Sequence, residues 1–170
     1  MKGLIRSSVS PFVAALVFAP AAWALDEGSS SFLKEAAQGG LAEVELAEVA
    51  QERAARKEVK DLAKKIEDHH KKANDQLKSL AENKDVELPD EPAKQHKQTK
   101  EQLEKLKGAQ FDQAYLQTMV QEHQKDIRKF EQQAKSAKDP EVKQFASQTL
   151  PTLKEHLKQA QALQKPSSSK

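Results

Sequence analysis

The sequence predicts an all-α protein, a four-helix bundle, and three observations support this prediction. The chain is rich in Ala, Leu, Lys, Glu and Gln, which favour helices, and poor in β-branched residues. Apolar residues recur at the three- and four-residue spacing that places them on one face of a helix. The few glycines and prolines lie mostly where these periodic segments end, as expected of helix boundaries.

Residues 1–24 are expected to form a cleaved secretory signal. Lys2 and Arg6 give a positive start, residues 9–22 are apolar, and Ala-Trp-Ala at 22–24 has the A-x-A cleavage pattern. The alternative is an uncleaved inner-membrane anchor, but the apolar run is shorter than the ~20 residues of a membrane span. No later segment approaches that length. We therefore expect a soluble, exported, periplasmic protein with no transmembrane segment in the mature chain.

The mature chain is expected to start with a flexible leader, residues 25–30, followed by one helical bundle domain over residues 31–164. The first helix is predicted over residues 31–56, with Ser30 or Ser31 as its N-cap, because a serine hydroxyl accepts hydrogen bonds from free N–H groups.

The first hairpin pairs this helix with a second one, predicted over residues 58–83. Gly39 and Gly40 interrupt the first helix and indicate either a close helix–helix approach or a kink. Two prolines within residues 88–92 break the pattern, and a shorter amphipathic helix is predicted over residues 93–106. The apolar stripe of the second helix comprises Val59, Leu62, Ala63, Ile66, Ala73, Leu77 and Leu80.

The second hairpin pairs a helix over residues 111–136 with one that follows Asp139 and ends near Leu163. We take Asp112 as the N-cap of the former and Asp139 as the N-cap of the latter. Residues 165–170 are expected to be a disordered tail. Two antiparallel hairpins joined by a crossover with a short helix is the arrangement of ferritin-like four-helix bundles.

The composition excludes several functions. The chain has no cysteine, so thiolate catalysis and thiolate metal sites are excluded. Without the two basic residues of the predicted signal, 26 basic residues balance 26 acidic ones, and aromatic residues are few, so nucleic-acid binding is not expected. No serine–histidine–acid set or phosphate-binding loop is present, and we predict no catalytic residue, so an enzyme is not favoured.

Each of the four long helices has one metal-type side chain within its apolar stripe. These residues are Glu43, His69, His123 and His156. If all four point inward, one carboxylate and three imidazoles meet in the core, which suits zinc, iron, copper or manganese. The spacing also gives one Glu-x-x-His, Glu67 to His70, but the second copy expected of a diiron bundle is missing.

The alternative is that each histidine lies at the boundary of its stripe with its polar tip in water. His70 is interpreted as such a boundary residue, and His96, among Lys and Gln in the short helix, as a surface residue.

The chain resembles the domain of unknown function 4142 family of small exported bacterial proteins, over residues 31 to 163. The resemblance implies a ferritin-like bundle. It implies no settled activity. The Glu and His positions of the family motifs correspond to Glu43, His69, His123 and His156. The segments that carry it are Gly39-Gly40-Leu41-Ala42-Glu43-Val44, Asp68-His69, Leu88-Pro89, Phe111-Asp112-Gln113-Ala114-Tyr115, Glu122-His123 and Leu150-Pro151-Thr152-Leu153-Lys154-Glu155-His156-Leu157.

The sequence therefore favours an exported bundle that binds a metal through the Glu/His set, in metal handling or stress protection. The alternative is a structural or chaperone-like interaction module of the cell envelope that binds no metal. Protein partners are left open by the sequence.

Overall fold

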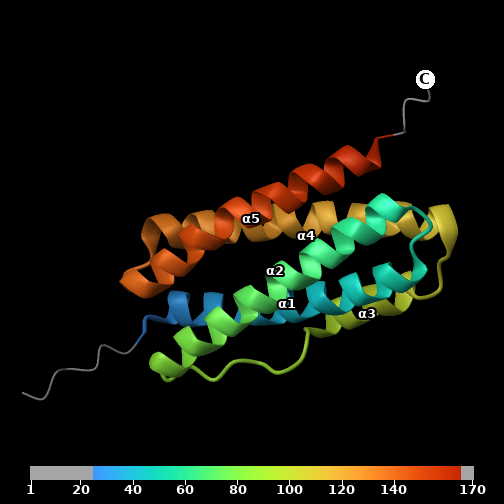
Figure 1. Ribbon diagram of the computed structural model, residues 1–170. Helices are drawn as coiled ribbons and strands as arrows, with labels where there is room; N and C mark the ends of the chain where they lie inside the picture. The colour runs from blue at the N-terminus through green and yellow to red at the C-terminus, as the bar shows by residue number, and fades with distance from the viewer. Residues whose placement is uncertain (1–24, 166–170) are drawn as a thin grey trace, which may run out of the picture.

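A computed structural model of the protein describes residues 25–165, so the predicted signal and most of the predicted tail lie outside the described residues. The described part is helical, which confirms the all-α prediction, and it contains no strand beyond one isolated bridge (Figure 1). No described helix has the length and apolarity to cross a membrane. The helices are α1 (Glu27–Arg53), α2 (Lys57–Asn83), α3 (Lys94–Leu103), α4 (Gly108–Ser136) and α5 (Pro140–Gln164).

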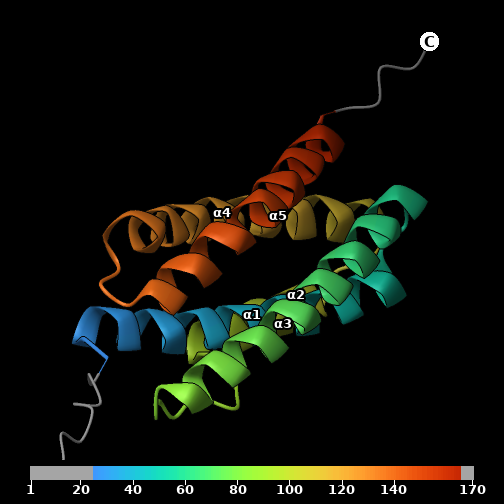
Figure 2. The ribbon, with the colours of Figure 1, turned by 60° about the vertical axis from the view of Figure 1, so that its left-hand side comes forward.

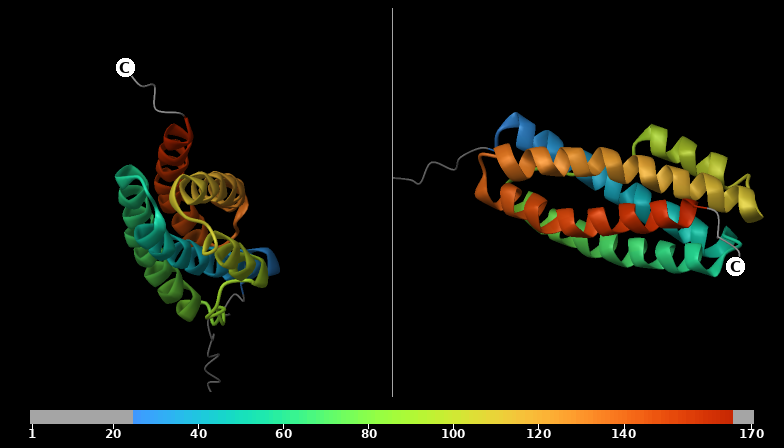
Figure 3. Two further views of the ribbon diagram at one scale, coloured as in Figure 1. Left: turned by 90° about the vertical axis from the view of Figure 1, so that its right-hand side faces the viewer. Right: turned by 90° about the horizontal axis from the view of Figure 1, so that it is seen from above.

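The long helices pack as two pairs, α1 with α2 and α4 with α5, and these are the most extensive contacts between elements. The pairs meet where α2 contacts α5 and α1 contacts α4 (Figure 3). The chain reverses within each pair, so α1 and α5 run in one direction while α2 and α4 run in the other (Figure 2). Residues 84–107, which include α3, lead back along the bundle, and α3 packs on α1 and α4.

Helix α1 begins at Glu27, four residues earlier than predicted. Asp26, and neither Ser30 nor Ser31, is the N-cap: its carboxylate accepts hydrogen bonds from the Ser29 backbone N–H at 3.1 Å and from the Ser29 hydroxyl at 2.8 Å. Residues 27–30 are therefore helical, which corrects the expectation of a flexible leader there.

Asp112 does not cap its own helix, which corrects a second prediction. Helix α4 starts earlier, at Gly108, so Asp112 lies in its second turn and is buried. Its carboxylate accepts hydrogen bonds from the backbone N–H groups of Ala55 at 2.9 Å and Arg56 at 3.0 Å, and from the Arg56 side chain. Asp112 thus holds the connection between α1 and α2 from across the bundle.

The glycine pair of α1 marks a close approach rather than a break, because α1 continues through both residues. A Cβ added to Gly40 would lie 2.1 Å from Oδ1 of Asn74 on α2. The lack of a side chain at Gly40 therefore lets this part of α2 lie close to the backbone of α1.

The core consists of two apolar clusters, one toward each end of the long helices. One polar residue of each long helix separates the two clusters along the chain. The first cluster includes Leu46, Ala50, Val59, Ile66, Phe111, Tyr115, Met119 and Ala160. The second includes Phe32, Leu33, Leu77, Ile127, Phe130, Val142, Phe145 and Leu153.

Candidate metal centre

The polar layer between the two apolar clusters consists of Glu43, His70, His123 and His156, one residue from each long helix. All four are buried; His123 and His156 have no exposed surface, and Glu43 retains 2%. The neighbours on each helix explain this burial. His70 follows Ile66 by four positions, as His123 follows Met119, so each histidine shares the inward face of its helix.

The carboxylate of Glu43 lies at the centre of the polar layer. Its Oε2 is 2.7 Å from Nε2 of His70, and its Oε1 is 3.1 Å from Nδ1 of His123. Neither carboxylate oxygen nor His70 Nε2 has a partner with hydrogen-bond geometry, although all three atoms are buried. Buried polar atoms normally have a hydrogen-bond partner, so these three atoms are candidates for binding a cation.

The other imidazoles form a chain of hydrogen bonds whose tautomers follow from one fixed acceptor. His123 Nδ1 donates to the Met119 carbonyl oxygen at 2.9 Å, because a carbonyl can only accept. His123 Nε2 then accepts from Nδ1 of His156 at 3.1 Å. His156 Nε2 in turn accepts from Nδ1 of His69 at 2.9 Å. This chain leads from the interior to His69, which is half-buried.

The four groups of the polar layer carry one pair of opposite charges. Burial raises the pKa of Glu43, but the facing imidazoles of His123 and His70 lower it more, to about 2. Burial lowers the pKa of His70, but the Glu43 carboxylate raises it above its usual value. Burial lowers the pKa of His123, and burial with the neighbouring histidines lowers the pKa of His156 to about 3. The lowered pKa of Glu43 and the raised pKa of His70 favour an ion pair between these two groups, beside the two imidazoles whose pKa values are lowered.

This arrangement fits a transition-metal ion. His70, His123 and His156 each place one ring nitrogen within 4.8 Å of the others. Around an ion with nitrogen ligands at about 2.0–2.1 Å, neighbouring ligand atoms lie roughly 3 Å apart. The 3.1 Å between Nε2 of His123 and Nδ1 of His156 is close to that separation.

Of the four residues predicted from the sequence, the structure brings Glu43, His123 and His156 together in the interior. His69 lies beside them, half-buried and bonded to His156, outside the group of three imidazoles. The sequence interpretation missed His70, which is 6% exposed and not a boundary residue. A signal for it was present, because it lies four positions after Ile66 and seven before Leu77, both of them apolar.

His96 is also buried, at 9% exposed, so its interpretation as a surface residue was wrong. Helix α3 packs on α1 and α4, and His96 Nε2 lies 3.6 Å from Oε2 of Glu122 on α4. The Lys and Gln residues next to His96 in the sequence did not indicate its burial, because the contact with Glu122 depends on where the crossover lies.

A small cavity of about 20 Å³ adjoins the polar layer, with room for about one water molecule. Gly40, His70 and Asp126 are among the residues that line it. Burial and the nearby Glu43 carboxylate raise the pKa of Asp126 to about 7. Asp126 is therefore an additional acidic group next to the layer.

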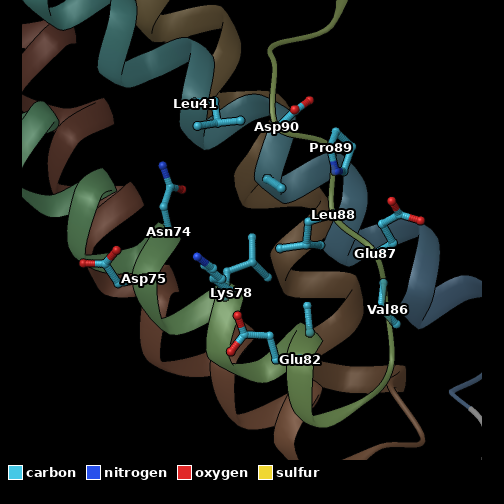
Figure 4. A pocket seen from close by; sticks show the side chains of 13 residues that line it. Leu41, Asn74, Asp75, Lys78, Glu82, Val86, Glu87, Leu88, Pro89 and Asp90 are labelled. Atoms are coloured by element: carbon cyan, nitrogen blue, oxygen red, sulfur yellow. The ribbon is translucent and has the colours of Figure 1, made fainter.

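A separate groove of about 500 Å³ lies between α2, α1 and the crossover segment (Figure 4). Leu88 and Pro89 form its crossover side, and Lys78 and Glu82 belong to its α2 side. None of the histidines lines this groove, so it is not part of the candidate centre.

Fold and site together define a helical-bundle protein with a buried histidine and glutamate layer. The chain belongs to the DUF4142 family, described as a domain of unknown function, whose model matches residues 17–163. The structure is similar to the crystal structure of a DUF305 fragment from Deinococcus radiodurans, with a TM-score of 0.73 and 17% sequence identity. That likeness covers 82% of this chain and 97% of the other, and it concerns the fold alone. A comparison with curated proteins gave no match.

Proposed function

We propose that this protein binds one divalent transition-metal ion in its interior through His70, His123 and His156, with Glu43 supplying negative charge beside it. The observation that carries the proposal is the convergence of three buried imidazoles beside Glu43, whose carboxylate oxygens, like His70 Nε2, lack a partner with hydrogen-bond geometry. Three imidazoles and a carboxylate suit zinc, copper, iron or manganese, whereas magnesium and calcium prefer oxygen ligands.

The residues around the layer would orient its ligands. The Met119 carbonyl accepts from His123 Nδ1 and leaves Nε2 of that ring as the ligand atom. For Nδ1 of His156 to serve as a ligand, its proton moves to Nε2 of the same ring, which then donates to Nδ1 of His69. The Nδ1 proton of His69 moves to its own Nε2 in the same exchange, so that Nδ1 can accept. Such outer hydrogen bonds fix ring orientation in metal sites, so we assign His69 a positioning role.

Without a bound ion, the polar layer is not expected to stabilise the fold. Removing an ionised carboxylate and an imidazolium from water costs several kcal/mol per ion, and their attraction repays this only with good hydrogen bonds. The Glu43–His70 contact lacks that geometry. A bound cation would supply the missing interaction, which favours metal binding over the alternative of a purely structural or chaperone-like module.

The proposal extends to the architecture and the compartment. The closed ring of contacts among α1, α2, α5 and α4, with a long crossover between the pairs, supports a ferritin-like four-helix bundle. The signal-like residues 1–24 support export to the periplasm, and the absence of cysteine is compatible with it. We assign a role in metal handling or stress protection there.

The test is zinc content at equilibrium. The protein is loaded with excess zinc, desalted and analysed for bound metal, beside His123→Ala and His156→Ala variants. The wild type is expected to retain one zinc per chain and each variant much less. Leu116→Ala is the matched control, since it truncates a buried side chain of α4 outside the layer, and it is expected to retain one zinc. Equal zinc in the wild type and His123→Ala, or none in the wild type, would refute the proposal.

A further inference from the structure

A second groove, of about 260 Å³, lies on the face formed by α1, α3 and α4. His96 of α3 and Glu122 and Asp126 of α4 line it, and Gly39 of α1 completes one side. Glu122 and Asp126 are one helical turn apart, so both carboxylates belong to the same face of α4.

His96 is the unusual member of this groove. Its side chain is 10% exposed, yet Nδ1 has no hydrogen-bond partner, and Nε2 lies 3.6 Å from Glu122 Oε2, beyond hydrogen-bond distance. A buried imidazole without a hydrogen bond beside a carboxylate is a pair of groups ready to bind a cation.

The groove and the interior cavity share a wall. Asp126 lines both of them. Gly39 lines the groove and Gly40 lines the cavity. Asn74 of α2 lies against Gly40, whereas a Cβ added to Gly39 would lie 3.7 Å from Oδ2 of Asp126, so the two spaces adjoin at Gly39 and Asp126. Asp126 is close enough to Glu43 and His70 for their charges to interact.

We propose that His96, Glu122 and Asp126 form an access site, through which a divalent transition-metal cation reaches the interior histidines past Gly39 and Asp126. The inference rests on the proposed interior site. His96 and Glu122 bind the partly hydrated cation first, and Asp126 passes it to the cavity beside His70.

The lysines around the groove do not oppose this assignment. Lys129 forms an ion pair with Glu35, and Lys125 lies 3.7 Å from Glu122. Asp126 forms no such pair with a lysine among the described residues. The groove therefore retains a carboxyl group without a lysine partner on the side nearest the interior.

The experiment measures the rate of zinc uptake by the full chain, by stopped-flow competition with a chromophoric chelator, together with the equilibrium Kd. Glu122→Gln and His96→Gln are expected to slow uptake about tenfold, within the range of electrostatic focusing. Because the access site is not the final site, release should slow equally and Kd should not change. Glu101→Gln, an exposed carboxylate of α3, removes the same charge and is the control expected to leave the rate unchanged.

The outcomes separate the two proposals. If the wild type binds zinc but Glu122→Gln and His96→Gln take it up at the wild-type rate, the access site is refuted and the interior site stands. If His69→Gln slows uptake and the groove variants do not, the cation passes between α2 and α5 instead. A wild type that holds no zinc at equilibrium overturns both proposals.

Discussion

The buried pair of Glu43 and His70 should respond in opposite ways to single and paired substitution in the metal-free protein. His70→Leu leaves the Glu43 carboxylate buried without its nearest cation. Breaking a buried ion pair in this way costs about 3–5 kcal/mol. Glu43→Leu should cost less, because His70 can lose its proton near neutral pH whereas the carboxylate must gain one. Leucine is similar in volume to both residues, so neither change opens a large cavity.

Replacing both residues together should restore or raise the free energy of unfolding. Substituting a buried ion pair with apolar residues of similar volume is often neutral or stabilising by about 1–4 kcal/mol. For the roughly 140 described residues, 1 kcal/mol corresponds to roughly 3 °C in Tm. We therefore expect His70→Leu to lower Tm by roughly 10–15 °C and the double variant to match or exceed the wild type.

The assay is far-UV circular dichroism during thermal and urea unfolding, in buffer treated with a chelator. The double-mutant cycle isolates the coupling between the two residues. A double variant that is as unstable as His70→Leu would refute the reasoning, since the polar layer would then stabilise the fold by itself. That result would favour the structural alternative over metal binding.

Three further predictions concern other parts of the molecule. Zinc at 100 times its Kd should stabilise the wild type by about 2.7 kcal/mol, which is roughly 8 °C in Tm, and a chelator should reverse the shift; no shift in differential scanning fluorimetry would contradict the interior site. Asp112→Ala leaves the N–H groups of Ala55 and Arg56 without their acceptor and should lower the free energy of unfolding by about 2–3 kcal/mol. A urea midpoint equal to that of the wild type would contradict the role of Asp112 in holding the α1–α2 connection. Burial raises the pKa of Asp139, but the Lys84 ammonium and the N-terminus of α5 lower it more, so the net pKa is below its usual value. The resulting stability is present above about pH 4 and is lost as the pH falls through the folded pKa, so the difference between the wild type and Asp139→Asn in urea unfolding should be constant near pH 7 and shrink toward pH 2; a difference independent of pH would contradict it.

The all-helical fold was predictable because helical periodicity is a local property of the chain. The stripe from Val59 to Leu80 and the Asp139-Pro140 start signal need no knowledge of the neighbouring helices. The start of α1 was misplaced because three serines follow Asp26, and any of these side chains can cap a helix. The hydrogen bonds from Ser29 to the Asp26 carboxylate define the earlier start.

The site was predictable only in part because neighbouring residues of a helix point about 100° apart, and a stripe can accommodate either of two. His69 follows Ile66 by three positions and His70 follows it by four, and both spacings are compatible with an inward direction. Helix α2 also contacts α5, so His69 meets His156 at the edge of the bundle while His70 meets Glu43 of α1. The pair therefore divides into an inner histidine of the polar layer and an outer histidine bonded to His156, and this division depends on which helix lies on each side. The position of His96 also depends on the neighbouring helices. The crossover places it beside Glu122 of α4, and no residue spacing within α3 specifies that contact. Helix periodicity identifies the residues that can take part, and the order of the helices around the bundle decides which of them meet.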